Sequence, residues 1–150
     1  MNKTPLRHLL VPFDTSPSSR AAVARAAALA EAFDADIDLL AVSHVPQPLA
    51  GEAIALGDHF VDADIRRRRE DMDAALEQLA AQGVRARGHV ALGFAADVII
   101  ERANSGAYDG VVMGTRGLTG LSYAWDRSIA GRVVRESVIP VFTVHAPASA

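Results

Sequence analysis

Residues 114 to 128, GTRGLTGLSYAWDRS, contain the residue types that hold phosphate groups in loops. Gly114, Gly117 and Gly120 recur every three residues, and the hydroxyl-bearing Ser128 ends the stretch. Glycine permits positive φ and lets backbone N–H groups approach an anion closely. A helix that begins near Ser128 would add the unpaired N–H groups and the partial positive charge of its N-terminus. The stretch is therefore a candidate phosphate-binding loop, and a flexible turn between a strand and a helix fits the same spacing equally well.

Any phosphate site in this chain must work almost without lysine. Of the 15 lysine and arginine residues, Lys3 is the single lysine. A phosphate loop of the GxxxxGKS/T kind needs a lysine after its last glycine, so that motif is excluded. Phosphate binding would depend on backbone N–H groups, hydroxyls and arginine.

Asp14 follows the short apolar run LLVPF at residues 9–13 and precedes Pro17. An acidic residue at a strand end can accept hydrogen bonds from ribose hydroxyls, as in dinucleotide-binding folds. It also fits the start of a helix, because Ser16 and Pro17 are typical N-cap and first-turn residues. The two interpretations do not exclude each other.

The segment GLSYA, residues 120–124, nearly matches the GxSxG motif of hydrolases, with Ser122 as the nucleophile. That motif needs its serine on a tight turn directly after a strand, whereas Ser122 lies eight residues beyond Gly114. The five histidines are scattered, and no pair has the spacing of metal ligands. We therefore predict neither a catalytic residue nor a metal site, and the hydrolase is the weakest alternative.

The elements that would position these residues alternate along the chain. Apolar runs predict strands at 9–13, 37–45, 84–92, 110–114 and from Pro140 through 141–145, and helices are expected at 18–33, about 59–82, 95–104 and 128–137. This order predicts an α/β fold, an open five-stranded parallel sheet that is doubly wound, with helices on both faces. Such sheets bind ligands at the carboxyl ends of the strands where the winding reverses, and both Asp14 and Gly114 lie at such ends.

Composition limits the remaining classes of protein and of binding partner. The 150 residues predict one domain, 1–150, and the net charge of −3 favours neither nucleic acid nor an anionic membrane as a partner. No cysteine is present, and no apolar stretch reaches the length of a membrane span. The N-terminal apolar stretch is too short for a signal peptide, so we expect a cytoplasmic protein.

The run RRRR at residues 66–69 could suggest a nucleic-acid surface. Opposite charges lie four residues apart on the expected helix: Asp62 with Arg66, Arg66 with Glu70, Arg67 with Asp71, and Arg69 with Asp73. Such pairs stabilise a solvated helix by about 0.2–0.5 kcal/mol each. We therefore interpret the run as a solvated face.

Several segments together resemble the universal stress protein family. They are VPFDTSPSS and AVARAAALA near the start, LLAV in the second strand, and VVMGTRGLTG…RS and RVVRESVIPVFTV near the end. The resemblance covers nearly the whole chain. It implies a five-stranded parallel α/β fold, usually a homodimer, and in many members ATP bound at the switch point of the sheet.

The family's phosphate pattern is a glycine, two residues, a second glycine, nine residues, a third glycine, and then serine or threonine. Gly114 and Gly117 match the first two glycines and Ser128 matches the hydroxyl, but Arg127 occupies the third glycine position. If that position needs positive φ, arginine is costly there. If its conformation is ordinary, the guanidinium could instead contact phosphate through two hydrogen bonds.

The resemblance also implies where the rest of a nucleotide would lie. Asp14 matches the acid that binds ribose, and Val42 matches the residue whose backbone meets adenine. Pro12 and Met113 would line the base pocket. The expected ligand is ATP, or AMP or ADP, and Mg²⁺ could accompany ATP.

The last strand, Val141 to His145, is expected at an edge of the sheet, where an unpaired apolar strand invites pairing. The family dimerises through this strand, so a homodimer is expected. The alternative is an edge that is covered within the monomer.

Together these features predict a stress-response protein that binds an adenine nucleotide as a ligand and is not a dedicated enzyme. The stretch from Gly114 to Ser128 has no lysine to stabilise a transferring phosphoryl group, so at most slow ATP hydrolysis is expected. The alternative is a nucleotide-free dimeric interaction protein in which Arg127 has replaced the third glycine.

Overall fold

The computed structural model of the protein describes residues 5–44, 54–115 and 129–146. Of the residues singled out above, Lys3, Gly117, Gly120, Ser122, Arg127 and Ser128 lie outside these ranges. The same is true of residues 45–53, which connect the second strand to the second helix along the chain.

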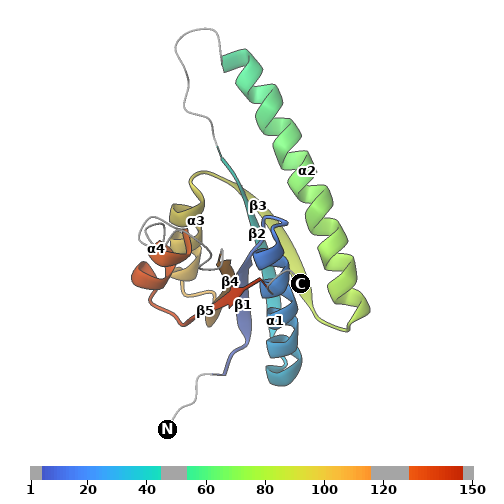
Figure 1. Ribbon diagram of the computed structural model, residues 1–150, viewed down its shortest axis with the longest axis vertical. Coiled ribbons are helices and arrows are strands. Elements are labelled where there is room, and N and C mark those ends of the chain that lie inside the picture. Colours follow the sequence, from blue (N-terminus) through green and yellow to red (C-terminus); the bar gives the residue numbers. More distant parts are fainter. Residues whose placement is uncertain (1–4, 45–53, 116–128, 147–150) are drawn as a thin grey trace.

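Within these ranges, nine elements alternate along the chain, as expected from the sequence (Figure 1). They are β1 (His8–Pro12), α1 (Pro17–Phe33), β2 (Asp36–Ser43), α2 (Ile54–Ala81), β3 (Ala86–Leu92), α3 (Ala95–Ala103), β4 (Gly110–Thr115), α4 (Ile129–Glu136) and β5 (Val141–His145). The strands form one parallel sheet in the order β3-β2-β1-β4-β5. The predicted open five-stranded parallel sheet is thus confirmed.

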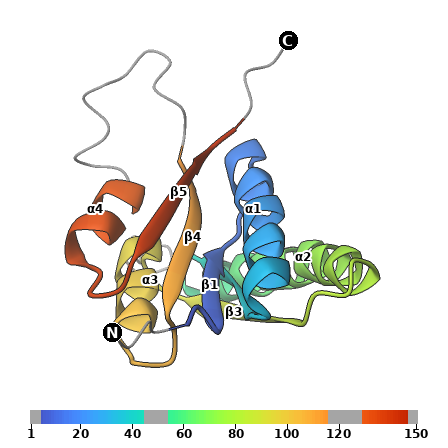
Figure 2. The same ribbon diagram turned by 90° about the horizontal axis from the view of Figure 1, so that it is seen from below.

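The helices cover both faces of the sheet (Figure 2). The first face packs against α1 and α2, which contribute Ala22, Ala26, Met72 and Leu79 to one buried cluster. The second face packs against α3 and α4, which contribute Ile99, Ala103, Ala130 and Val133 to the other. We call these the α1/α2 face and the α3/α4 face.

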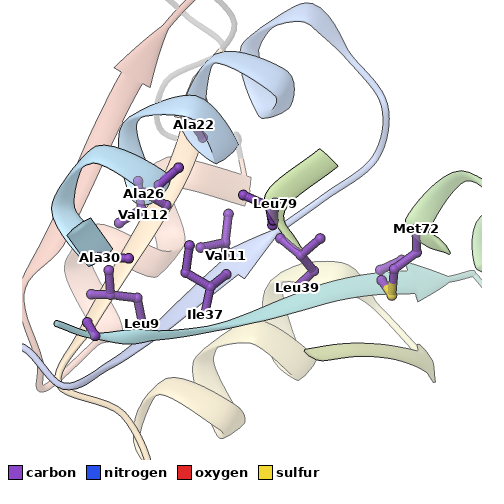
Figure 3. Packing of buried hydrophobic residues seen from close by; sticks show 13 residues of the cluster. Leu9, Val11, Ala22, Ala26, Ala30, Ile37, Leu39, Met72, Leu79 and Val112 are labelled. Carbon is purple, nitrogen blue, oxygen red and sulfur yellow. The ribbon is translucent and has the colours of Figure 1, made fainter. Parts of the chain in front are cut away.

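The core of the α1/α2 face consists of aliphatic side chains from the inner strands and small side chains from α1 (Figure 3). Leu9 and Val11 of β1 and Ile37 and Leu39 of β2 are fully buried. Because α1 presents alanines to these strands, the helix lies close to the sheet. Parallel strands that are covered on both faces are continuous apolar runs, which is why LLV in β1 and LLA in β2 could be recognised.

Helix α1 begins as the sequence predicted. The side chain of Ser16 accepts a hydrogen bond from the backbone N–H of Ser19, and Pro17 occupies the first helical position. The helix ends at Phe33, where Asp34 takes the left-handed conformation with φ of 55°.

Helix α2 ends as predicted but begins earlier. Gly83 has φ of 77°, and the N–H groups of Gly83 and Val84 donate to the carbonyls of Ala80 and Leu79, a Schellman cap. The predicted start near His59 is wrong, because the helix already begins at Ile54. Gly57 therefore lies inside the helix, where a single glycine costs only about 1 kcal/mol relative to alanine.

Candidate functional site

Strands β1 and β4 are neighbours at the centre of the sheet, and the described helices that follow them pack on opposite faces. The chain after β1 continues into α1 on the α1/α2 face, and α4, the next described element after β4, packs on the α3/α4 face. This is the switch point at which parallel α/β sheets bind ligands. Asp14 follows β1 and Gly114 lies near the end of β4, so both are placed where the sequence predicted.

The three residues expected to line a base share one face of the sheet. Val42 and Met113 belong to the apolar cluster under α3 and α4. Leu10 belongs to the same cluster, and strand side chains alternate between faces, so Pro12 lies on that side as well. The carboxyl ends of β1, β2 and β4 therefore present an apolar surface on the α3/α4 face, of the kind against which a planar base can pack.

Asp14 is exposed, and its carboxylate makes a contact typical of a helix start. Its Oδ1 accepts a 3.0 Å hydrogen bond from the backbone N–H of Ser16, and its own N–H donates to the hydroxyl of Ser19 at 3.3 Å. Between them Thr15 adopts φ of 65°, a left-handed conformation that costs a non-glycine residue roughly 1–2 kcal/mol. The cap itself is Ser16, and Asp14 supports it by accepting from the N–H of Ser16, while a role of Asp14 toward ribose stays a prediction.

Gly114 has a packing role that the sequence did not reveal. A side chain at this position would meet the backbone of the first turn of α1, with the carbonyl oxygen of Ser18 at 2.5 Å and the N–H nitrogen of Ser19 at 2.7 Å. Since backbone atoms cannot move aside easily, the approach of α1 to β4 requires glycine here. Any contact of Gly114 with phosphate would be an additional role.

Thr115, the last residue of β4, is tied to the edge strand. Its Oγ1 lies 2.7 Å from Nδ1 of His145, its partner in the β4–β5 register. Thr115 is buried and His145 is exposed. The hydrogen bond therefore joins the carboxyl ends of β4 and β5.

A cavity of about 390 Å³ opens at the carboxyl ends of β1 and β2, on the side of α2. It is lined by Phe13, Asp14, Thr15, Ala41, Arg67, Arg68 and Asp71. Ala41 belongs to the α1/α2 cluster, so this cavity lies on the opposite face from Val42 and Met113. Asp14 borders this cavity. The charged side chains of Arg67, Arg68 and Asp71 therefore lie near the residue that is predicted to bind ribose.

Two arginines of the cavity are oriented by one carboxylate. Asp64 Oδ1 lies 2.7 Å from Nη2 of Arg67, and Asp64 Oδ2 lies 2.7 Å from Nε of Arg68. The fully buried Ser43, the last residue of β2, donates its hydroxyl to Asp64 Oδ2 at 2.6 Å. This hydrogen bond, followed by that of Arg68, lowers the pKa of the Asp64 carboxyl. The network fixes α2 against the carboxyl end of β2.

This arrangement corrects the expected charge pairing on α2. None of the four predicted pairs four residues apart is present in the described part of the helix. Asp64 takes both Arg67 and Arg68 instead, because it lies beside β2, where Ser43 holds it. The interpretation of RRRR as a merely solvated face therefore missed two arginines that line a cavity.

The sequence also did not reveal the residues that act from neighbouring strands or helices. Asp64 and His145 reach the carboxyl end of the sheet from α2 and β5, and no local motif marks them, whereas Arg68 belongs to the RRRR run, whose charge pattern does not indicate a cavity. For His145 the one signal is its position, since it ends an apolar run at a predicted sheet edge. Within the described ranges, no group of three or more histidine, aspartate and glutamate side chains could hold a metal ion. No helix in these ranges is long and apolar enough to span a bilayer.

Comparison with known proteins gives the family. The model of the universal stress protein family matches residues 5–145. Universal stress protein MJ0531 of Methanocaldococcus jannaschii is 28% identical over 142 residues, which cover 94% of this chain and 83% of that protein.

Solved structures share the fold. Universal stress protein UspA from Lactobacillus plantarum has a TM-score of 0.83 at 19% identity, covering 95% of this chain and 99% of that one. A universal stress protein family protein from Arabidopsis thaliana, solved with AMP bound, has a TM-score of 0.63 at 19% identity, covering 95% of this chain and 93% of that one.

Proposed function

Because the chain belongs to the universal stress protein family, we propose that it is a cytoplasmic stress-response protein that binds an adenine nucleotide as a ligand at the switch point of its sheet. Pro12, Val42 and Met113 contact adenine, the backbone of Val42 pairs with its polar edge, and Asp14 accepts from the ribose hydroxyls. The phosphates meet the stretch from Gly114 to Ser128.

The observation that carries this proposal is the shared face of the three base-lining residues. Val42 and Met113 belong to one apolar cluster, Pro12 lies on the same side of β1, and all three are at carboxyl ends. Asp14 follows β1 directly beside them. The AMP in the Arabidopsis thaliana structure, on the same fold, supports an adenine nucleotide as the ligand class.

The nucleotide is a ligand and not a rapidly consumed substrate. Lys3 is the single lysine of the chain, and Asp126 is the single carboxylate between Gly114 and Ser128. Rapid phosphoryl transfer needs cationic groups around the transferred phosphoryl and a residue that orients the nucleophile. Slow hydrolysis is compatible with this composition, and Mg²⁺ would enter as the counterion of ATP.

We further propose a homodimer through β5. The strand is at the edge of the sheet and pairs with β4 on one side. Phe142, a large apolar residue of this strand, is 37% exposed. An exposed apolar edge favours pairing with a second copy about a two-fold axis, the commonest oligomeric arrangement.

Competition binding tests the nucleotide proposal. ATP analogues should compete with labelled ATP for wild-type protein, and Gly117→Val should weaken that binding, because a branched side chain crowds the phosphate-binding backbone. If analogues did not compete and Gly117→Val were indistinguishable from wild type, the proposal would fall.

Arg127 separates this proposal from a nucleotide-free interaction protein. If arginine has destroyed the phosphate site, Arg127→Gly should create or strongly increase ATP affinity. If the site is retained, the same change should alter the affinity only modestly.

A further inference from the structure

The cavity of about 390 Å³ lies on the α1/α2 face, away from the face proposed for adenine. Ligand pockets range from about 300 to 1,000 Å³, so this cavity fits a small molecule. Its apolar part consists of the buried Phe13, directly after β1, and the buried Ala41 of β2. Its polar part comes from α2 and from the turn between β1 and α1. The cavity thus combines an apolar surface with charged groups, as ligand sites commonly do.

The two arginines of the cavity are held in place by the protein. Asp64, which accepts a hydrogen bond from Ser43, binds Arg67 through Nη2 and Arg68 through Nε, each at 2.7 Å. Each guanidinium carries five N–H donors. Within the part of the chain that the structure describes, Asp64 is the one side chain that these guanidiniums bind, so most of their donors remain for a ligand. A carboxylate matches such donors, because it accepts two parallel hydrogen bonds from a guanidinium.

Asp71 brings a negative charge to the same cavity. It lies four residues after Arg67 on α2, a spacing at which opposite charges commonly pair. Among the described residues, however, Asp71 has no hydrogen bond or ion pair, since Asp64 takes Arg67 instead. Residues four apart on a helix have their Cβ atoms about 5–6 Å apart, so one small molecule can reach both Arg67 and Asp71.

The balance of charge decides the class of ligand. Arg67 and Arg68 give the lining two positive charges. Asp14 and Asp71 give it two negative charges, and Asp64, which binds both arginines, adds a third. A phosphate or a dicarboxylate would bring further negative charge next to these carboxylates, and a simple cation would meet the arginines. A zwitterion, with one group of each sign, matches the lining.

We propose that this cavity binds a free α-amino acid with an apolar side chain. The carboxylate of the ligand binds Arg67 and Arg68, its ammonium group binds Asp71, and its side chain packs on the apolar part of the cavity. This site lies on the opposite face of the sheet from the surface proposed for adenine, and Asp14 is the residue that the two sites share. The inference goes beyond the proposed nucleotide binding and does not rest on it.

Calorimetric titration of the full chain with L-leucine tests the proposal. We expect one site per chain with a dissociation constant below about 1 mM. Leucinamide lacks the carboxylate and 4-methylpentanoate lacks the ammonium group, so each should bind at least about tenfold more weakly. Glycine, which lacks the apolar side chain, should also lose about tenfold or more. No nucleotide takes part, so a negative result here leaves the nucleotide proposal untouched.

Substitutions on α2 assign the two charged groups of the ligand. Asp71→Asn should weaken leucine binding about tenfold but should not weaken 4-methylpentanoate, which has no ammonium group to lose. Arg67→Gln should weaken leucine binding about tenfold but should not weaken leucinamide, which has no carboxylate. Both side chains are exposed, so the variants should keep the fold. The matched controls are Asp73→Asn and Arg66→Gln, which remove equal charges from exposed positions of α2 outside the cavity lining and should leave leucine affinity unchanged.

Saturable leucine binding with this pattern of losses would support the proposal. The proposal would be overturned if leucine did not bind below about 1 mM, or if either analogue bound as tightly as leucine. It would also be overturned if Asp73→Asn cost as much affinity as Asp71→Asn, because the loss would then come from the charge of the helix as a whole. Tighter binding of inorganic phosphate than of leucine would identify a simple anion site and would likewise contradict it.

Discussion

The α-carbon of Gly114 in β4 lies against the peptide group of Ser18 in the first turn of α1. A Cβ at residue 114 would stand 2.5 Å from the Ser18 carbonyl oxygen, closer than Cβ contacts occur in proteins. Because α1 follows β1 and packs against Gly114 of β4, this contact links β1 and β4, the two strands of the switch point. It gives the first glycine of the GTRGLTG segment a role in the fold that is independent of any ligand.

Gly114→Ala should lower the free energy of unfolding by about 1–3 kcal/mol, because the methyl group meets backbone that cannot rotate away. Urea denaturation measures the loss. Gly110→Ala, on the same strand, is the matched control, since a Cβ there meets side chains of Leu9 and Phe142 at ordinary contact distances of 3.4 Å. Equal stability of the two variants would contradict the packing role of Gly114.

The hydrogen bond from Ser43 to Asp64 should make stability depend on pH. It lowers the pKa of Asp64, so its contribution is complete above the ordinary aspartate value of about 3.9 and is lost as the pH falls through the lowered folded value. Ser43→Ala should therefore cost about 1 kcal/mol at neutral pH and progressively less below pH 4.

Urea denaturation of wild type and Ser43→Ala between pH 7 and pH 3 checks this dependence. The control is Ser105→Ala, because Ser105 donates to the backbone carbonyl of Arg102, which does not titrate. Its cost should stay constant over the range. A Ser43→Ala cost that grows on acidification would have the wrong sign for a lowered pKa.

Asp14 should show two separable roles. Asparagine keeps an oxygen for the N–H of Ser16 but removes the charge, so Asp14→Asn should be about 1 kcal/mol more stable than Asp14→Ala. Both variants should bind AMP about tenfold more weakly than wild type, because a carboxylate is the stronger acceptor for ribose hydroxyls.

An AMP analogue without the 2′ and 3′ hydroxyls isolates the ribose role. It should bind wild type and Asp14→Asn with the same affinity, as measured by calorimetry. If Asp14→Asn weakened the analogue as much as AMP, Asp14 would not act through the ribose.

A charge on the exposed edge should prevent dimerisation. Phe142→Glu places a carboxylate on β5 next to its copy across a two-fold axis, and sedimentation should then give the monomer mass. Phe33→Glu, at an exposed position on α1, should leave the wild-type mass unchanged. A wild type that sediments as a monomer, or a dimer that survives Phe142→Glu, would contradict the β5 interface.

The sequence predicted the architecture because its signals are local. The apolar runs around Leu9, Leu39 and Val112 are long enough for buried strands, and Ser16 with Pro17 marks a helix start. Gly83 marks the end of α2. Each of these features follows from backbone chemistry within a few residues, so no knowledge of tertiary contacts was needed.

The features that the sequence did not reveal depend on contacts between distant segments. Asp38 is buried in β2 and accepts a 2.8 Å hydrogen bond from the hydroxyl of Tyr108, 70 residues away. Burial, followed by this carboxylate, raises the pKa of Tyr108. The hydrogen bonds of Asp64 with Ser43 and of Thr115 with His145 also join distant residues, 21 and 30 positions apart. Such partners are chosen by the topology of the sheet and not by spacing along the chain.

The central claim is that the switch point holds an adenine nucleotide, and calorimetric titration of nucleotide-free protein with ATP tests it most directly. We expect one site per chain, with a dissociation constant in the micromolar range, equivalent to about −8 kcal/mol of binding free energy. A flat titration with folded, nucleotide-free protein would contradict the account.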